Sequence, residues 1–167
     1  LVGKRWENVN IPATIDGSSV LGLYTDATYS TEIVGFYTVK GTANETIYGR
    51  FCSKESPYLI ENKEDLELLR SKVNSSKTAW RNGYFKLMKA DGSPVTLTLN
   101  GWKYGIGSAN DYFEGTFDGN ASGGSSIIFG GDYSSSDSSP YSTCGLFGYV
   151  GREGTVKNVN AISKFYK

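Results

Sequence analysis

Histidine is absent from the 167 residues of this chain. The imidazole group is the side chain best suited to acid and base catalysis near neutral pH, and it is also a common zinc ligand. Its absence excludes a Ser-His-Asp triad and a histidine-based metallopeptidase site from this chain.

Cysteine is also scarce, since the chain has two, Cys52 and Cys144. A disulfide scaffold needs more cysteines, so the fold must rest on an apolar core. Two alternatives are open for this pair, a single disulfide bridge or two small buried apolar side chains. Because their sequence contexts place them in different modules, we expect two free thiols.

The chain has no excess of charge of one sign, because 17 basic and 17 acidic side chains give a net charge of zero. No basic face is implied, so we expect no nucleic-acid partner. No apolar run approaches the ~18 residues that cross a membrane, so we expect no membrane insertion within this chain. No secretory signal is visible. Because the first residue is Leu1 rather than methionine, we expect a trimmed piece of a longer protein.

Glycine and tyrosine are abundant, with 21 glycines and 12 tyrosines against 8 phenylalanines. This mixture is typical of an exposed, turn-rich β protein. Residues 113–120 and 145–150 alternate bulky apolar residues with glycine or small polar ones, which predicts strands with one buried face. Asp118-Gly119 predicts a tight turn, because glycine accepts a positive φ at little cost. Together with residues 154–162, these blocks are typical of a solenoid of stacked coils.

The segment "FEGTFDGN…GLFGYVGREGTVKNVN" resembles the GLUG-type motif of bacterial surface proteins, which also occurs in the amino-terminal regions of IgA-cleaving metallopeptidases. The upstream segment "YLIENKEDLELLRSKVNSS…YFKLMKADGSPVTLTLNGWKYGIGS" resembles the lead-in of that family, and the match covers residues 58–162. The resemblance implies a right-handed parallel β-helix that opens with a short strand, a capping helix and a first coil.

Residues 1–53 predict a separate small β module, with strands near 9–15, 20–23, 33–39 and 47–51. The pattern "LGLYTDATYSTEI…TVKGTANETIYGRF" resembles the Listeria–Bacteroides repeat, which implies a β-grasp-like fold. Leu23 stands where that repeat usually has tryptophan, and Tyr48 alone is kept from its closing segment. The polar residues 53–57 predict the boundary between the modules.

Residues 54–167 predict the capping helix and first coils of the solenoid. Residues 63–73 form an amphipathic helix pattern, with Asn62 as N-cap and the apolar stripe Leu66, Leu69 and Val73. Further strands are expected at 80–88, with Tyr84 or Phe85 pointing inward, and at 95–99. The serine-rich residues 132–142 predict a protruding loop. No terminal cap follows the last block, so we expect the chain to continue in the natural protein.

Acidic residues offer a candidate catalytic or calcium site, which we do not favour. A glycosidase needs two carboxylates that flank the scissile bond, and the candidates are Asp111, Glu114, Asp118 and Asp132. Asp118 is explained by its turn and Glu114 by an outward position in a strand. The clusters also lack the spacing of a calcium loop. We therefore expect no catalytic residue, no metal and no cofactor.

Four aromatic residues form the candidate ligand-binding set, namely Trp102, Tyr104, Tyr112 and Tyr133. Tyrosine and tryptophan combine apolar area with a polar group, which suits an exposed surface that recognises sugar or protein. The alternative, which we favour, is that Trp102 and Tyr112 pack into the coil or under the cap. The N-glycosylation pattern occurs at Asn44, Asn74 and Asn120.

We expect a non-catalytic fragment of a secreted or cell-surface bacterial protein that acts in adhesion or as a spacer and display module. Its partner would be a host or cell-surface protein or a glycan. One alternative is an accessory region of a larger secreted peptidase or polysaccharide-degrading enzyme. The other is a carbohydrate-binding module that uses the aromatic residues. Fold alone does not decide among these functions.

Overall fold

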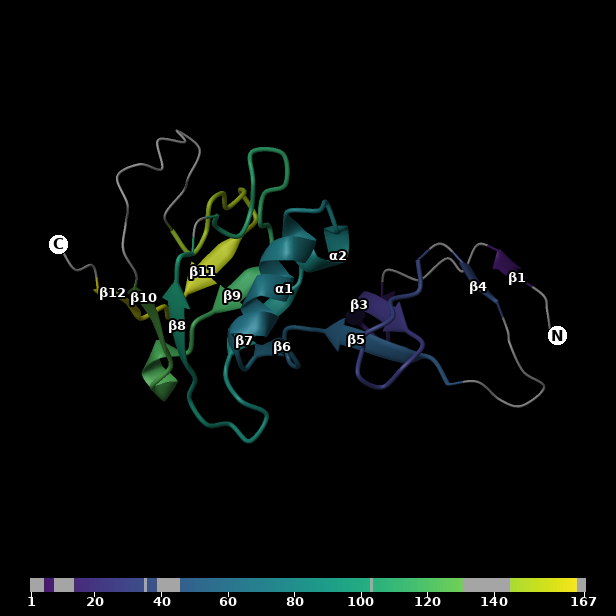
Figure 1. Ribbon diagram of the computed structural model, residues 1–167, viewed down its shortest axis with the longest axis horizontal. Coiled ribbons are helices and arrows are strands. Elements are labelled where there is room, and N and C mark those ends of the chain that lie inside the picture. Colours follow the sequence, from purple (N-terminus) through teal and green to yellow (C-terminus); the bar gives the residue numbers. More distant parts are fainter. Residues whose placement is uncertain are drawn as a thin grey trace. The chain divides into compact units, whose positions relative to one another are not determined.

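In the computed structural model the chain is mainly β and divides into two compact units, Leu1–Ser53 and Lys54–Lys167 (Figure 1). The structure describes residues 5–7, 14–34, 36–38, 46–102, 104–130 and 145–164. The first unit contains antiparallel sheets. The second contains parallel sheets and the helices.

The first unit has five described strands. β2 (Thr14–Ile15), β3 (Ser18–Tyr24) and β5 (Tyr48–Cys52) form an antiparallel sheet in that order. β1 (Arg5–Glu7) pairs antiparallel with β4 (Phe36–Thr38). The strands expected at 20–23 and 47–51 are confirmed as β3 and β5, and the β-grasp-like topology stays a prediction.

The described core of the first unit is formed mainly by β3, with one residue of β5. Its buried apolar side chains are Val20, Leu21, Tyr24, Ile33 and Cys52. Tyr24 contacts the ring of Tyr29 edge to face at 5.3 Å between centroids. The expectation for the two thiols stays a prediction, because Cys144 lies outside the described residues, as do Val9 and Ile11 of the first expected strand.

The second unit contains two sheets in which every pairing is parallel. The first has the order β11-β9-β7-β6 and the second β12-β10-β8. Their strands are β6 (Tyr58–Ile60), β7 (Tyr84–Leu87), β8 (Thr96–Asn100), β9 (Thr116–Asp118), β10 (Ser126–Gly130), β11 (Thr155–Lys157) and β12 (Ala161–Lys164). A 3-10 turn, η1 (Ala121–Gly123), lies between β9 and β10.

Side chains in matching positions of these strands form columns through the core. Phe85, Phe117 and Val156 are aligned in the first sheet, and the two phenylalanines are fully buried. In β8 the pattern alternates, with Leu97 and Leu99 buried between exposed polar residues, as the sequence predicts. Isolated parallel bridges join Ile106 to Phe147 and Phe113 to Val150. The same set of aligned positions therefore recurs along the chain.

The helix predicted at residues 63–73 is confirmed as α1 (Lys63–Val73). The Asn62 Oδ1 atom accepts a hydrogen bond from the Asp65 backbone N–H at 2.9 Å, which satisfies one of the unpaired donors at the helix start. Leu66, Leu69 and Val73 are fully buried. α1 contacts β6 and β8, which are the edge strands of the two parallel sheets, so its apolar stripe covers this end of the core.

The strand expected at residues 80–88 begins later than predicted. Trp80 belongs to the short helix α2 (Thr78–Arg81), because the backbone N–H groups of Trp80 and Arg81 both donate to the Lys77 carbonyl. This turn places the Trp80 ring in a stack on Phe85, at 5.9 Å between centroids. Tertiary packing of Trp80 therefore overrides the strand preference of an aromatic residue.

The turn after Asp118 also differs from the prediction. The residue with positive φ is Asn120, at 50°. Glycine is needed at position 119 because the backbone of Asn158 and Val159 lies close to it. A Cβ atom at position 119 would lie 2.7 Å from the Asn158 carbonyl oxygen and 2.8 Å from the Val159 Cα. Glycine at this position lets β9 and the segment after β11 lie side by side.

Candidate functional site

The four predicted aromatic site residues do not form one platform. Trp102 is half-buried, since its Nε1 atom donates to the Gly145 carbonyl at 3.2 Å and the Arg70 guanidinium lies 4.2 Å from its ring centroid. Tyr104 is 57% exposed and takes part in no ring contact among the described residues. Tyr133 lies outside the described residues. Trp102 therefore packs into the fold, as the favoured alternative expects.

Tyr112 instead pairs with Tyr149, a residue that the sequence reasoning missed. The two rings contact edge to face at 6.0 Å between centroids, and each side chain is 42% exposed. The expectation that Tyr112 packs into the coil is therefore wrong for this residue. The signal that relates them is the alignment of "NDYFEG" with "LFGYVG", in which each tyrosine precedes an apolar residue of the bridge between Phe113 and Val150.

The backbone holds these tyrosines in place. The Phe113 N–H donates to the Tyr149 carbonyl at 3.1 Å, and the Gly151 N–H donates to the Phe113 carbonyl at 2.9 Å. Phe113 is fully buried, so its neighbours along an extended chain point outward. Tyr112 and Tyr149 are therefore presented side by side on the outer surface by two bonded segments.

An open hollow of about 460 Å³ lies beside the backbone of Tyr112, and neither tyrosine side chain lines it. We call it the Arg81 hollow, and its lining residues are Thr78, Arg81, Asn82, Glu114 and Glu153. Arg81 joins it to the tyrosine pair, because its Nε atom donates to the Tyr112 carbonyl at 2.9 Å. The Arg81 carbonyl in turn accepts from the Glu114 N–H at 2.9 Å.

Glu114 lines this hollow and has a structural role. It lies just before β9 rather than in a strand, and its carboxylate accepts a hydrogen bond from the Glu153 N–H at 3.1 Å. A Cβ atom at position 151 would lie 1.9 Å from the Glu114 Oε1 atom, so a larger residue there would displace the Glu114 carboxylate. The Glu114 side chain therefore points outward, as predicted, but Glu114 does not belong to a strand, so that part of the prediction is wrong.

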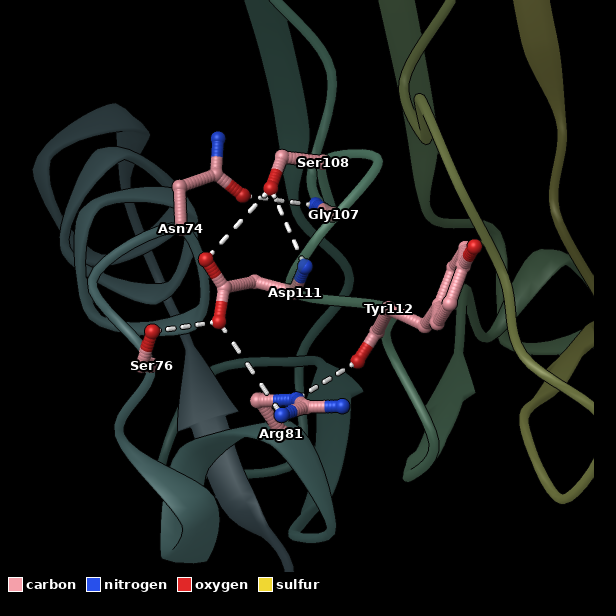
Figure 2. Close-up of polar contacts among 7 residues, drawn as sticks. All are labelled: Asn74, Ser76, Arg81, Gly107, Ser108, Asp111 and Tyr112. Carbon is pink, nitrogen blue, oxygen red and sulfur yellow. Dashed lines mark hydrogen bonds and ion pairs between the residues drawn. The ribbon is translucent and has the colours of Figure 1, made fainter.

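Asp111 is buried and its carboxylate is held by three partners (Figure 2). Ser76 Oγ donates to Oδ1, Ser108 Oγ lies 3.4 Å from Oδ2, and an Arg81 guanidinium nitrogen lies 3.9 Å from Oδ1. Beside it, the Asn74 amide donates to the Gly105 carbonyl and accepts from the Gly107 N–H at 2.8 Å. Through Asn74 and Ser76, these contacts hold residues 105–111 against the end of α1.

Asp118 has a structural environment as well. Its Oδ1 atom accepts from the Asn120 N–H at 2.9 Å and from the Asn158 amide at 3.2 Å, and its Oδ2 atom lies 3.7 Å from Lys157 Nζ. The fourth acidic candidate, Asp132, lies outside the described residues. Within the described part of the chain, no group of three or more acidic or cysteine side chains is arranged to hold a metal ion.

The fold makes two of the predicted N-glycosylation sites, Asn74 and Asn120, inaccessible to modification. Both ends of the Asn74 amide are engaged by backbone groups, and Asn120 is 9% exposed. An oligosaccharide at either asparagine would require local unfolding, because the modified nitrogen must reach solvent. Asn44 lies outside the described residues.

The described groups with a shifted pKa do not line the Arg81 hollow. Hydrogen bonds from Thr28, Ser30 and Thr31 hold the pKa of Asp26 well below its usual range. Hydrogen bonds from Ser93 lower the pKa of Asp91 in the same way, and burial raises the pKa of Tyr24. Asp26 and Asp91 are turn residues, so these shifts indicate local turn stability rather than a catalytic centre.

Comparison with family models, with curated proteins and with solved structures gave no match to this chain. Among the described residues, no helix has the length and apolar character needed to span a bilayer. The candidate site therefore rests on geometry, and it consists of Tyr112, Tyr149 and the Arg81 hollow.

Proposed function

We propose that this chain is a non-catalytic module of a secreted or cell-surface bacterial protein, which acts in adhesion or as a spacer that displays other domains. In this proposal a small β module precedes the opening coils of a right-handed parallel β-solenoid. The GLUG-type and Listeria–Bacteroides resemblances belong to the same proposal.

The observation that carries the proposal is the parallel register of the second unit. Phe85, Phe117 and Val156 occupy one column and recur about 30 to 40 residues apart, within the range of solenoid repeats. The second sheet and the two isolated bridges repeat in the same chain order. The right hand is supported by the strong preference for right-handed crossovers between parallel strands of one sheet.

The position of α1 supports the same proposal. A solenoid exposes apolar side chains and unpaired strand edges at its ends, so a cap is needed for solubility. α1 lies against both edge strands at one end of the stack and buries three apolar side chains there. At the opposite edge, Val156 is 39% exposed although its column partner Phe117 is fully buried.

The acidic side chains support a non-catalytic reading. Asp111, Glu114 and Asp118 each hold backbone or side-chain groups of the fold, as structural carboxylates do. A hydrolase would need a pair that faces a bound substrate with room between the two carboxyl groups.

Attachment of coated beads tests this function. Beads that carry the full chain should bind to epithelial or bacterial cells in a saturable way, and soluble chain should compete if the module is an adhesin. If the beads do not attach, the spacer function predicts that the second unit resists mechanical unfolding in single-molecule pulling. Hydrolysis of a polysaccharide or a protein by the purified chain would contradict both functions.

A further inference from the structure

We infer that Tyr112, Tyr149 and the Arg81 hollow form a binding site for an uncharged oligosaccharide. The inference rests on the proposed adhesive function and names the class of ligand through which the module would attach. It assigns the site to residues that the fold brings together from segments far apart in the sequence.

The tyrosine pair provides the apolar part of the site. Sugar rings present faces of C–H groups, and an exposed tyrosine offers a matching apolar ring together with a hydroxyl group. Tyr112 and Tyr149 are each 42% exposed, while the core beneath them is already filled by Phe113. The bonded backbone of the two segments fixes the rings in advance, and tyrosine has few rotatable bonds to immobilise on binding.

The Arg81 hollow provides the polar part. Thr78 and Asn82 are exposed, and neither side chain forms a hydrogen bond within the described residues. Arg81 uses its Nε atom for the Tyr112 carbonyl, which leaves further guanidinium donors. A hydroxyl, an amide and a guanidinium match the hydroxyl groups of a sugar, and the Tyr112 carbonyl that Arg81 contacts joins them to the segment that carries the aromatic surface.

Charge in the hollow decides the class of sugar. Its lining contains one cation, Arg81, and two carboxylates, Glu114 and Glu153, and the buried Asp111 carboxylate lies near the same guanidinium. The local charge is therefore negative, which disfavours uronates and sulfated or sialylated chains. The Glu114 carboxylate accepts from the Glu153 N–H and the Arg81 guanidinium lies in the same lining, so both offset the acidic charge that a cationic sugar would need. An uncharged chain fits this surface best.

Binding of the full chain to an array of uncharged, acidic and amino-sugar oligosaccharides tests the inference. The uncharged set comprises cello-, xylo-, manno- and malto-oligosaccharides, and the best probe is then titrated by calorimetry. Tyr112→Ala and Tyr149→Ala should each weaken that binding by about tenfold, the effect of losing about 1.4 kcal/mol. Asn82→Ala should weaken it by a smaller factor.

Tyr104→Ala is the matched control, because it removes the same side chain from the same unit at a more exposed position with no ring partner among the described residues. It should leave the affinity unchanged. Tyr112→Phe keeps the ring and should retain more affinity than Tyr112→Ala. A thermal melt equal to that of the parent shows that each variant is folded.

Several results would overturn the inference. They include the absence of binding to every uncharged probe, a preference for acidic or amino sugars, and unchanged affinity in folded Tyr112→Ala and Tyr149→Ala. In each case the bead-attachment experiment still tests the adhesive function separately. Sugar binding that depends on Tyr104 would support adhesion while it contradicts this site.

Discussion

At the scale of single residues, carboxylates at turns accept hydrogen bonds from several backbone N–H groups. Asp26 is an example in the first unit, since it accepts from the N–H groups of Thr28 at 3.0 Å, Ser30 at 3.0 Å and Thr31 at 2.9 Å. Hydrogen bonds to the ionised form favour that form, so the pKa of Asp26 is lowered by folding. The charge of Asp26 therefore contributes to stability.

The sign of this contribution predicts a pH dependence. Stability from Asp26 is fully present above its unfolded pKa of about 3.9 and is lost as the pH falls through the lower folded pKa. Asp26→Asn should therefore lower the urea midpoint at pH 7, and the difference from the parent should shrink below about pH 4. The Ile33 amide, which bonds to the Leu23 carbonyl, reports the midpoint by NMR.

Asp16→Asn is the control for that experiment, because Asp16 is an exposed turn residue whose carboxylate has no hydrogen-bond partner within the described residues. It should shift the midpoint little at either pH. An Asp26→Asn midpoint equal to the parent's at pH 7 would show that the hydrogen bonds of this turn do not stabilise the first unit.

Residues that act locally could be predicted from the sequence, and residues that act across the fold could not. Asn62 caps a helix that begins at the next residue, so its role follows from a short motif. Asp111 is held by Ser76 and Arg81 from distant segments. The pairing of Tyr112 with Tyr149 likewise depends on which segments become neighbours, which the local pattern does not specify.

At the scale of elements, α1 is the most informative segment of the second unit. Its N-cap and its apolar stripe follow from propensity and spacing, and the structure confirms both. β8 could be predicted for the same reason, since its alternation spans the whole strand. The short helix α2 has one turn and carries no periodic signal, so packing of Trp80 decides its conformation.

Truncation of the buried leucines tests the role of α1. Leu66→Ala and Leu69→Ala each remove a fully buried side chain and should cost about 2–5 kcal/mol, the transfer term plus a cavity. Each should lower the melting temperature of the second unit by calorimetry of the full chain. Each should also increase association, because a loosened helix exposes the strand edges that it contacts.

Leu68→Ala is the matched control, because Leu68 lies in the same helix but is half-buried. It should lower the melting temperature less than either of the other substitutions. If Leu66→Ala and Leu69→Ala melt like the parent and do not associate, α1 does not close the end of the stack.

At the scale of the whole chain, two units with different sheet types follow one another. The mainly β character could be predicted from alternation and glycine content. The partners of each strand could not, because parallel neighbours such as β7 and β9 are separated by a long stretch of chain. The resemblance to GLUG-type proteins supplied the expectation of parallel coils, and the solenoid with its right hand stays a proposal.

Parallel register is the central claim, because the proposed function and the tyrosine site both depend on it. Two columns of methyl-bearing residues cross β8, β10 and β12 and make the register measurable. Leu97, Ile127 and Ala161 form the first column, and Thr98, Ile128 and Ile162 form the second. Neighbouring strands lie about 4.8 Å apart, so methyl groups of adjacent strands are close enough for nuclear Overhauser contacts.

Methyl spectroscopy of the full chain tests this register most directly. We predict contacts of Ile127 with both Leu97 and Ala161, and of Ile128 with both Thr98 and Ile162. A shift of one residue would move each side chain to the opposite face of the sheet. Contacts of Ile127 with Thr98 and Ile162 in place of the predicted ones, or no contacts between these strands, would contradict the parallel stack.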